Sequence, residues 1–454
     1  MRIAFIAFLA LLFLAPIPYA LVPPLPQAAA LTAIWVLVVW TAIVRWMSGA
    51  DSGLRSVRWE AAALVVLAAW ICVQMLPLGG SLAHPLWAEL PVWLGRDLGG
   101  SISLSPELTF EALMRLLAYG GLFWLVLQFG QDRRQAMIIL AVVVATGWLN
   151  ALYGIVNYIL GNETVLLASR VAYTDDVTGT FVNRNSAAAF FGLCLLPGVA
   201  YLAGALLTSS RSSRGRSRSE RISALQRKLE RAFLGIAVLA VPGSALLMSH
   251  SRAGTLSVVA AVVIVLALTA ATTAKGSRGT WIAVAGLGLV ILVGIIFGSE
   301  RLASRLEAGG LSLDDRAVAY QALWRAIQDS PFLGFGFGSF ERSFYLYMPA
   351  SLSTLFDRAH NDWLEGVAGL GWIGALLLNA ILASLTVRSL FGVFRRRRDR
   401  LFCIAAVAAS LQLAIHSFVD FSLQIPAVTF VFIVLLALGV AQSSSSRAHH
   451  HDAE

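Results

Sequence analysis

The sequence predicts an all-α fold, a polytopic membrane helix bundle of about 12 transmembrane helices. Hydrophobic residues make up 58% of the 454-residue chain and the mean hydropathy is +0.76, whereas charged residues make up only 13%. Soluble domains carry about 25% charged residues, so this composition excludes an ordinary soluble protein. A spanning helix needs about 20 consecutive apolar residues, and such runs recur along the whole chain. They lie near residues 3–20, 27–46, 60–78, 110–129, 136–159, 185–207, 232–248, 254–273, 280–298, 362–390, 402–420 and 427–442.

The first of these runs could also be a signal peptide, because only Met1 and Arg2 precede it. No clean small-x-small cleavage site follows it, so we expect a retained first helix. The orientation of the other spans is the same in either case.

Basic residues concentrate in alternate loops between the runs, and this pattern sets the expected orientation. Cytoplasmic loops carry an excess of Lys and Arg, so we expect these loops in the cytoplasm, together with a cytoplasmic tail over residues 442–454. The net charge of +9 and the pI near 9.9 then follow from topology. Basic segments beside spans favour contact with anionic membrane lipids over nucleic acid. The basic positions are Arg45, Arg55, Arg58, Arg133, Arg134, Arg211 through Arg231, Lys275, Arg278, Arg395 to Arg398 and Arg400.

The intervening loops then face the periplasm or the exterior, and the largest of them, residues 299–361, predicts a partly helical periplasmic lid. Asp314 and Asp315 favour a helix start within it, because acidic side chains complement the positive end of a helix dipole. Pro331 ends that helix. The other outer loops are 79–109, 160–184, 249–253 and 421–426.

Four polar groups fall on this outer side, and the first is the run Asn183-Arg184-Asn185 at the start of the sixth span. Asparagine caps helix starts, and a helix start offers free N–H groups and a positive dipole end to anions. With the guanidinium of Arg184 these features suit a phosphate. The alternative is an arginine that extends to lipid headgroups.

The second group is His250 and Arg252, in a very short turn between two apolar runs. We therefore expect both side chains near membrane depth. A buried arginine needs an anionic partner, and no carboxylate is close in the sequence. A ligand phosphate or a distant Asp or Glu must supply that charge.

The third group lies in the lid, where the predicted helix carries Arg316 back over the membrane mouth. Gly334, Gly336 and Gly338 follow it, without the spacing or the lysine of a P-loop. The alternation of Gly and Phe instead predicts a turn that packs aromatic side chains at the interface.

The fourth group is Arg358, His360, Asp362 and Glu365, at the mouth of the span that begins near residue 362. A charge at membrane depth costs on the order of 2.5–3.5 kcal/mol, and this clustering favours function over a structural histidine. His360 can accept a proton near neutral pH. Asp362 or Glu365 could set its tautomer.

His416 and Asp420 repeat this pattern four residues apart, at the outer end of the eleventh span. They could pair with each other or with Arg252, so we expect them to support the site.

The three cysteines, Cys72, Cys194 and Cys403, lie far apart inside predicted spans. This arrangement predicts neither a disulfide framework nor a zinc site. No cage of carboxylates for Mg²⁺ is evident either, so we expect no metal and no cofactor.

Taken in order, these motifs resemble the O-antigen ligase/polymerase family over roughly residues 175–430. The motifs are Gly-Thr-Phe-x-Asn-x-Asn (179–185), Ser-Arg-Ala-Gly (251–254), Arg316 with Trp324, Pro331-x-x-Gly-x-Gly-x-Gly, His-Asn-Asp-Trp-Leu-Glu (360–365) with Gly369-Leu-Gly, and His416-Ser-Phe-Val-Asp420-Phe-x-x-Gln-Ile-Pro426. The resemblance implies a catalytic region over 171–441, preceded by N-terminal transmembrane helices over 1–170.

The resemblance also implies an activity, that of a metal-independent, inverting glycosyltransferase whose donor is a glycan on undecaprenyl pyrophosphate. By position, Arg184 and Arg252 match the family's pyrophosphate-holding arginines, and His360 matches its histidine near the acceptor. Arg316 fits a third cationic contact. The implied location is the bacterial inner membrane, with the active site facing the periplasm.

Several activities remain open within and beyond this resemblance. A ligase moves the glycan onto lipid A-core, whereas a polymerase extends a growing polysaccharide, and protein O-glycosylation is a third possibility. A lipid or glycan transporter would also fit twelve spans, but its ionisable groups would gather near the bilayer midplane instead of on one face. A purely structural scaffold is disfavoured by the buried Arg and His.

Overall fold

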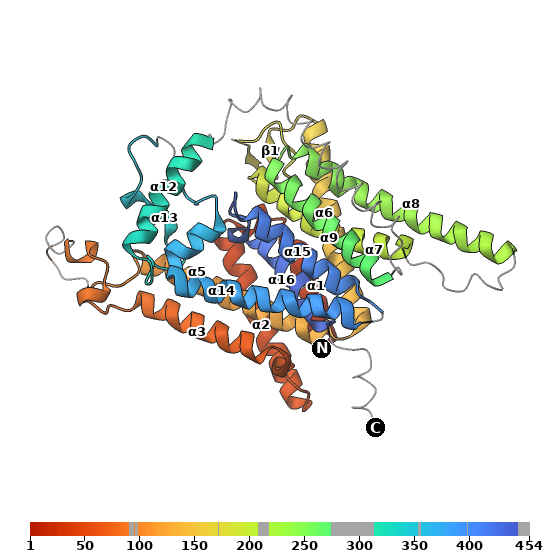
Figure 1. Ribbon diagram of the computed structural model, residues 1–454, viewed down its shortest axis with the longest axis horizontal. Coiled ribbons are helices and arrows are strands. Elements are labelled where there is room, and N and C mark those ends of the chain that lie inside the picture. The colour runs from red at the N-terminus through yellow and green to blue at the C-terminus, as the bar shows by residue number, and fades with distance from the viewer. Residues whose placement is uncertain are drawn as a thin grey trace.

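The structure is a computed structural model, and it describes residues 1–89, 95, 99–170, 172–207, 218–273, 313–352, 356–396 and 398–443. Within these ranges it is a bundle of helices with one two-stranded antiparallel sheet, formed by β1 (Thr164–Val165) and β2 (Ala168–Ser169) (Figure 1). Seven helices in this part of the chain are long and apolar enough to cross a membrane. The all-α polytopic fold class is therefore confirmed. The number of 12 spans stays a prediction.

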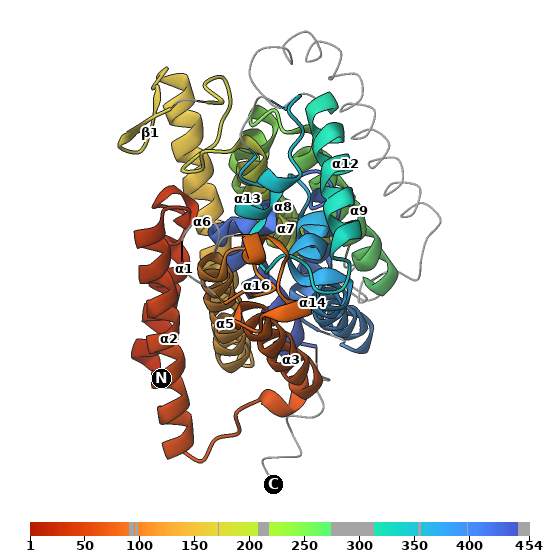
Figure 2. The ribbon, with the colours of Figure 1, turned by 90° about the vertical axis from the view of Figure 1, so that its left-hand side faces the viewer.

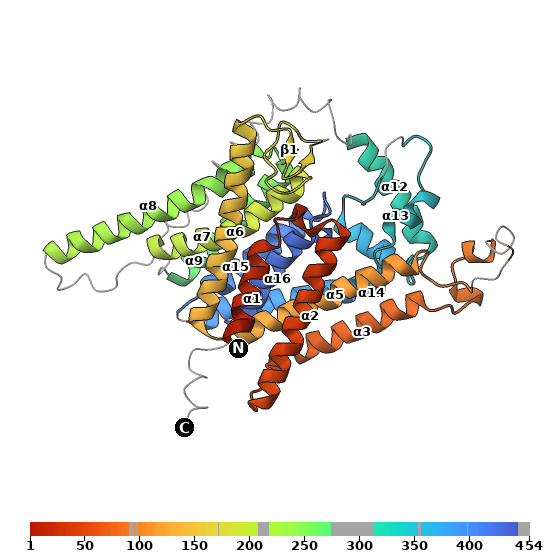
Figure 3. The same cartoon turned by 180° about the vertical axis from the view of Figure 1, so that it is seen from behind.

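The first half of the chain forms α1 (Arg2–Leu14), α2 (Pro24–Met47), α3 (Arg58–Met75), α5 (Pro106–Phe129) and α6 (Arg133–Ile159). Prolines begin α2 and α5, where the missing N–H costs no helical hydrogen bond. Asp132 caps α6 by accepting a hydrogen bond from the backbone N–H of Gln135 at 2.8 Å. Helices α1 and α2 lie side by side at the outside of the bundle (Figures 2 and 3).

The second half forms α7 (Arg184–Leu207), α8 (Arg218–Met248), α9 (Arg252–Thr273), α12 (Leu313–Asp329), α13 (Phe340–Ser343), α14 (Asp362–Arg395), α15 (Leu401–His416) and α16 (Pro426–Ala441). Short 3₁₀ helices span Tyr19–Leu21, Leu54–Val57, Gly80–Leu82, Phe344–Leu346 and Ser422–Gln424. The lid helix predicted between the acidic pair and Pro331 is α12.

Eleven of the twelve predicted runs lie on helices, seven of them long and four shorter. The span predicted at 280–298 lies outside the described residues, as do residues 299–312 of the lid and 444–454 of the tail. The first helix ends at Leu14, earlier than predicted, because Pro16 and Pro18 follow it and proline cannot continue the helical hydrogen-bond ladder. The basic loop before residue 232 is helical from Arg218 onward, because α8 continues from there into the predicted span.

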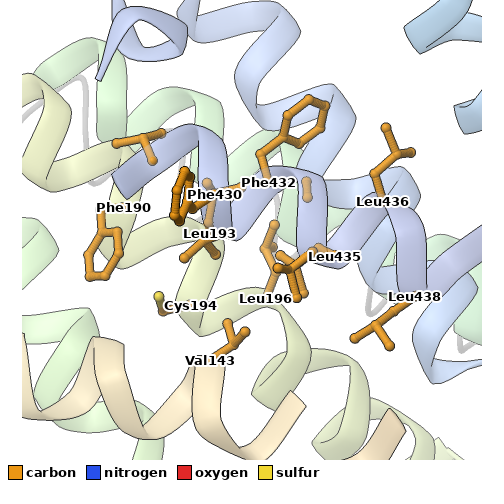
Figure 4. Close-up of a cluster of buried hydrophobic side chains, with 14 of the residues drawn as sticks. Val143, Phe190, Leu193, Cys194, Leu196, Phe430, Phe432, Leu435, Leu436 and Leu438 are labelled. Atoms are coloured by element: carbon orange, nitrogen blue, oxygen red, sulfur yellow. The ribbon is translucent and has the colours of Figure 1, made fainter. Parts of the chain in front are cut away.

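The core of the bundle is built around α7, α15 and α16. Phe190, Leu193 and Cys194 of α7 lie opposite Phe430 of α16 in a fully buried apolar cluster (Figure 4). Small residues let these helices approach closely, as they do in membrane bundles. A Cβ added at Gly147 of α6 would lie 2.2 Å from the Cβ of Cys194.

Polar contacts divide the bundle into two ends. At one end, which we call the inner end, the basic loops come together, and Arg388 pairs with Glu60 at 3.0 Å while Arg133 pairs with Asp399 at 2.8 Å. The other end, the outer end, carries β1 and α12, which lie along the upper side of Figure 1, whereas the N-terminus lies at its lower side. This separation agrees with the loop alternation expected from the basic residues.

The glycine-rich loop 331–338 packs against the beginning of α14. The backbone N–H of Phe335 donates to the carbonyl of Ala368 at 2.8 Å, and the side-chain amide of Gln74 donates to Leu333 at 2.8 Å and to Gly369 at 2.9 Å. Because backbone N–H groups of the loop are used within the protein, the loop is a packed turn, as the missing P-loop lysine predicted. The side chain of Phe335, within this loop, is buried.

Gly371 makes this packing possible, because it interrupts α14 with a φ of +69° and an added Cβ would lie 2.1 Å from the carbonyl oxygen of Phe332. We expect Gly371→Ala to lower the free energy of unfolding by at least the ~1–3 kcal/mol of left-handed backbone strain. The measurement is the thermal midpoint of purified protein in detergent. Gly366→Ala in the same helix is the control, because its added Cβ meets no atom within 4 Å. Equal midpoints for the two variants would contradict this account.

Candidate functional site

The outer end brings together side chains from five separate segments of the chain. They are the loop between α6 and α7, the turn between α8 and α9, the lid helix α12, the residues just before α14, and the turn after α15. Two clusters of ionisable groups form there, one around Asp176 and one around Asp420.

The first cluster centres on Asp176, whose side chain is buried. Its Oδ2 lies 3.2 Å from Nη1 of Arg184, and its Oδ1 lies 2.8 Å from Nδ1 of His250. The backbone N–H of Val177 donates to the carbonyl of Met248 at 3.0 Å, so the loop and the α8–α9 turn are joined beside these pairs. The sequence predicts an anionic partner for Arg252, but the Asp176 carboxylate contacts Arg184 and His250 instead.

The start of α7 follows the prediction in part. Asn183 is the helix cap, because its Oδ1 accepts a hydrogen bond from the N–H of Asn185 at 2.7 Å. Asn185 does not cap the helix, since its side-chain oxygen accepts from the Ser251 hydroxyl at 2.8 Å. This second contact ties α7 to the turn that carries His250.

The Gly-Thr-Phe run before α7 has a packing role. Gly179 has a φ of +57°, and an added Cβ would lie 1.9 Å from Oδ1 of Asn150. The Thr180 hydroxyl accepts from the Asn150 amide at 2.6 Å and donates to the carbonyl of Pro16 at 2.6 Å. The run therefore fixes the loop that carries Asp176 onto α6 and the end of α1.

The second cluster centres on the pair between His360 and Asp420, which are 8% and 0% exposed. Nδ1 of His360 lies 3.3 Å from Oδ1 of Asp420, and its ring meets the Phe421 ring edge-on at 4.8 Å between centroids. Tyr320 of α12 donates its hydroxyl to the His360 carbonyl at 2.6 Å. Side chain and backbone of His360 are thus both held.

Asp420 stays ionised in this environment. Burial by itself raises the pKa of a carboxyl group, but the hydrogen bond from His360 and the charges of His416 and His360 hold the pKa of Asp420 below its usual value. An ionised carboxylate accepts from Nδ1–H of His360 and leaves Nε2 of that ring to act as a base.

The two acidic residues at the start of α14 hold the protein's own structure. Oδ2 of Asp362 accepts from the Ser417 hydroxyl at 2.8 Å and from the N–H of Leu423 at 3.1 Å. Glu365 accepts from the N–H of Ala359 at 2.9 Å, and Arg358 lies 3.8 Å from its other oxygen. The expectation that Asp362 or Glu365 sets the tautomer of His360 is wrong, because Asp420 does so.

The histidine of α15 also differs from the expected pairing. His416 is fully buried, and its Nδ1 lies 2.8 Å from the Ser422 hydroxyl. The helix ends at His416, so Asp420 is not on the same helical face but in the following turn, where it reaches His360. The Asp420 side chain contacts His360 and that of His416 contacts Ser422, so neither side chain pairs with the other or with Arg252 in the contacts described, and their supporting role stays a prediction.

Tyr173 lies between the two clusters. The Cζ of Arg184 is 5.3 Å from the centre of its ring, a cation–π contact. Burial raises the pKa of Tyr173, and the charges of Arg184, Asp420 and Arg316 also act on it. Arg316 itself approaches the turn after α15, with Nη1 at 3.5 Å from the carbonyl of Val419. The clusters are therefore neighbours.

Backbone strain is present in both clusters and at Tyr173. Tyr173, His250 and His360 have φ values of +57°, +51° and +51°. Non-glycine residues in this region cost of order 1–3 kcal/mol. The other described non-glycine residues with positive φ are Tyr19, Ala20, Leu21, Leu166 and Asp399, so the strain adds to the contacts as an indication of the site and does not define it alone.

Arg252 departs from the prediction. It was expected to be buried beside His250, but it is exposed where it begins α9. The turn that carries it is therefore open to the outer surface at this point. Within the described residues, no group of three or more His, Cys, Asp or Glu side chains is arranged to hold a metal ion.

Asp176 and Tyr173 were missed by the sequence reasoning, although a signal for the carboxylate was present. A cationic turn near membrane depth needs an acid, and the outer loop 160–184 offers only Glu163, Asp175 and Asp176. Asp175 is exposed and Asp176 is buried. Only the folded loop distinguishes them.

Comparison with known proteins identifies a family match. Residues 236–379 match the family model described as O-antigen ligase. The matched segment contains His250, Arg252, Arg316 and His360, whereas Arg184 and Asp420 lie outside it. No curated protein matches the chain. The match confirms the resemblance drawn from the motifs.

The hydrogen bond from Tyr320 to the His360 carbonyl generates a prediction for this site. We expect Tyr320→Phe to fold normally and to lower activity about 2- to 10-fold, because a neutral hydrogen bond contributes about 0.5–1.5 kcal/mol and holds a strained histidine. Tyr345→Phe is the control, since Tyr345 is 46% exposed. Initial rates of the two variants at equal protein would settle the point, and an unchanged rate for Tyr320→Phe would count against a role in holding His360.

Proposed function

We propose that this chain, whose residues 236–379 match the O-antigen ligase family model, is a glycosyltransferase of the bacterial inner membrane that moves a glycan from undecaprenyl pyrophosphate to an acceptor hydroxyl on the periplasmic side. The observation that carries the proposal is the oriented His360–Asp420 pair, with Arg316 at the turn that carries Asp420 and Arg184 in the neighbouring cluster. A base and a set of cations at one end of a membrane bundle suit a reaction with an anionic, lipid-linked donor.

The arginines serve the leaving group in this proposal. Pyrophosphate leaves readily once its negative charge is neutralised, and preorganised cations beside a low-dielectric environment supply that stabilisation. Arg184 and Arg316 would contact the phosphates, and Arg252 is accessible to them on the outer surface. Guanidinium groups bind phosphate in a bidentate way, which makes the proposed mechanism metal-independent.

His360 serves the acceptor. Its Nε2 would take the proton of the acceptor hydroxyl as that oxygen attacks the anomeric carbon from the side opposite the pyrophosphate. The bond from the anomeric carbon to the phosphate oxygen breaks, undecaprenyl pyrophosphate leaves with the electron pair, and the anomeric configuration inverts. Asp420 stabilises the imidazolium that forms, as the carboxylate of a catalytic triad does.

The acceptor divides the proposal into two versions. We favour a ligase that uses lipid A-core, and the alternative is a polymerase that extends an O-antigen or exopolysaccharide chain. A lipid or glycan transporter is disfavoured because the ionisable clusters lie at the outer end of the bundle, whereas transport sites lie near the bilayer midplane.

Removal of His360 is the first test. We expect His360→Ala to abolish transfer, a loss of about 10²–10⁴-fold, while the protein still folds and expresses, with a lower thermal midpoint because the buried Asp420 loses its partner. The assay incubates protein in lipid with one undecaprenyl-pyrophosphate repeat unit from the native host, with and without lipid A-core. His84→Ala, outside both clusters, is the control and should retain activity.

The same assay separates the versions of the proposal. Product that forms only with lipid A-core indicates a ligase, and a glycan ladder without it indicates a polymerase. Normal yield from His360→Ala, or no product from the unmodified protein under any condition, would overturn the proposed enzyme. Activity that disappears with EDTA would overturn its metal independence.

Asp420→Asn tests the orientation of the histidine. An amide at this position can donate to Nδ1, which favours the tautomer with its proton on Nε2, where the acceptor's proton must go. We expect kcat to fall about 10²–10⁴-fold with a smaller change in the KM for the donor. A variant that loses donor affinity but keeps kcat would show that Asp420 has another role.

A further inference from the structure

The structure assigns a role to Asp176: we propose that it is a positioning residue of the donor site, which aims the Arg184 guanidinium and the His250 imidazole at the pyrophosphate of the lipid-linked donor. This inference rests on the proposed function, and it adds a residue that the motifs do not contain.

Each oxygen of the Asp176 carboxylate contacts one neighbouring side chain. Oδ2 lies 3.2 Å from Nη1 of Arg184, and Oδ1 lies 2.8 Å from Nδ1 of His250. One carboxylate therefore sets the distance and the direction between two side chains that come from different turns of the bundle. Such charge-assisted contacts are among the stronger hydrogen bonds in proteins.

The backbone that carries this carboxylate is held by further hydrogen bonds. Arg170 donates from Nη1 to the carbonyl of Asp176 at 3.1 Å and from Nη2 to the Thr178 hydroxyl at 2.7 Å. The N–H of Asp176 donates to the Tyr173 carbonyl at 3.2 Å, and the N–H of Val177 donates to Met248. The backbone around Asp176 is thus fixed before any ligand arrives.

Exposure distinguishes the carboxylate from its partners. The side chain of Asp176 is 7% exposed, whereas those of Arg184 and His250 are 28% and 36% exposed. The Asp176 carboxylate therefore lies behind the Arg184 and His250 side chains, which are the more exposed. Because Nδ1 of His250 is used by Asp176, Nε2 is the ring atom left for a ligand, and it can donate to a phosphate oxygen when the imidazole is protonated.

The pair on the acceptor side has the same arrangement. His360 also bonds a buried aspartate through Nδ1, and both histidines have a φ of +51°. The outer end therefore carries two aspartate–histidine pairs on either side of Tyr173. His360 would receive the acceptor's proton, and His250 with Arg184 would hold the departing pyrophosphate.

The experiment measures the affinity of undecaprenyl pyrophosphate for purified full-length protein in nanodiscs. We expect Asp176→Asn to weaken binding about 10- to 100-fold, and Asp176→Glu to restore part of it. In a background that lacks both partners, Arg184→Gln/His250→Ala, the further change Asp176→Asn should not weaken binding more, because neither side chain that the carboxylate positions is then present. The matched control is Glu60→Gln, a buried carboxylate paired with Arg388 at the inner end, which should leave the affinity unchanged.

Other outcomes would overturn the inference. Tighter binding by Asp176→Asn would mean that the carboxylate competes with the donor, and an additive loss in the background that lacks Arg184 and His250 would mean that it acts independently of both side chains. A lowered thermal midpoint with unchanged affinity would leave Asp176 a purely structural role. If Asp176→Asn does not fold, Asp176→Glu decides the matter, since normal affinity in that variant contradicts a need for defined geometry. Failure of the unmodified protein to bind the lipid would instead refute the proposed function.

Discussion

A charged side chain beside hydrocarbon must have a partner, and the outer end of this protein is organised by that constraint. The cost of an uncompensated charge there amounts to several kcal/mol. The buried carboxylate of Asp420 is bonded to His360, that of Asp176 to Arg184 and His250, and that of Glu60 to Arg388 at the other end. The pairs that make the charges tolerable also fix their directions, so stability and the geometry of the site have the same cause.

The rest of the bundle keeps these pairs in place. Helices α7, α15 and α16 form a buried core whose small residues allow close approach, and the turns that carry Arg184 and Asp420 begin or end on these helices. The loop 331–338 packs on α14 through Gly371 and fixes the lid from which Tyr320 reaches His360. Strain at the two histidines is supported by this surrounding structure, which over-determines their positions.

Much of the fold followed from the sequence, because hydropathy and basic loops act locally. The spans, the start of the lid helix, its end before Pro331 and the Asn183 cap are all signalled within a few residues. Pro16 and Pro18 also indicate the early end of α1, although the apolar run continues past them. What local patterns did not specify was which distant groups meet.

The pairings of the candidate site join groups that are far apart in the sequence. His360 and Asp420 are 60 residues apart, and His250 and Asp176 are 74 apart. Spacing suggested that Asp362 or Glu365 would serve His360, but a helix start directs those side chains to the turns around residues 359, 417 and 423. The exposure of Arg252 and the contacts of Gln74 likewise depend on packing between segments, which no single window of sequence contains.

The central claim is that one end of the bundle holds the donor pyrophosphate between Arg184 and His360. A cryo-electron microscopy map of the protein in nanodiscs with undecaprenyl pyrophosphate would test this claim most directly. The account predicts density for two phosphates within hydrogen-bonding distance of Arg184 and His250, with Nε2 of His360 facing the open side. Phosphate density at the inner end, or near the bilayer midplane between the helices, would contradict it.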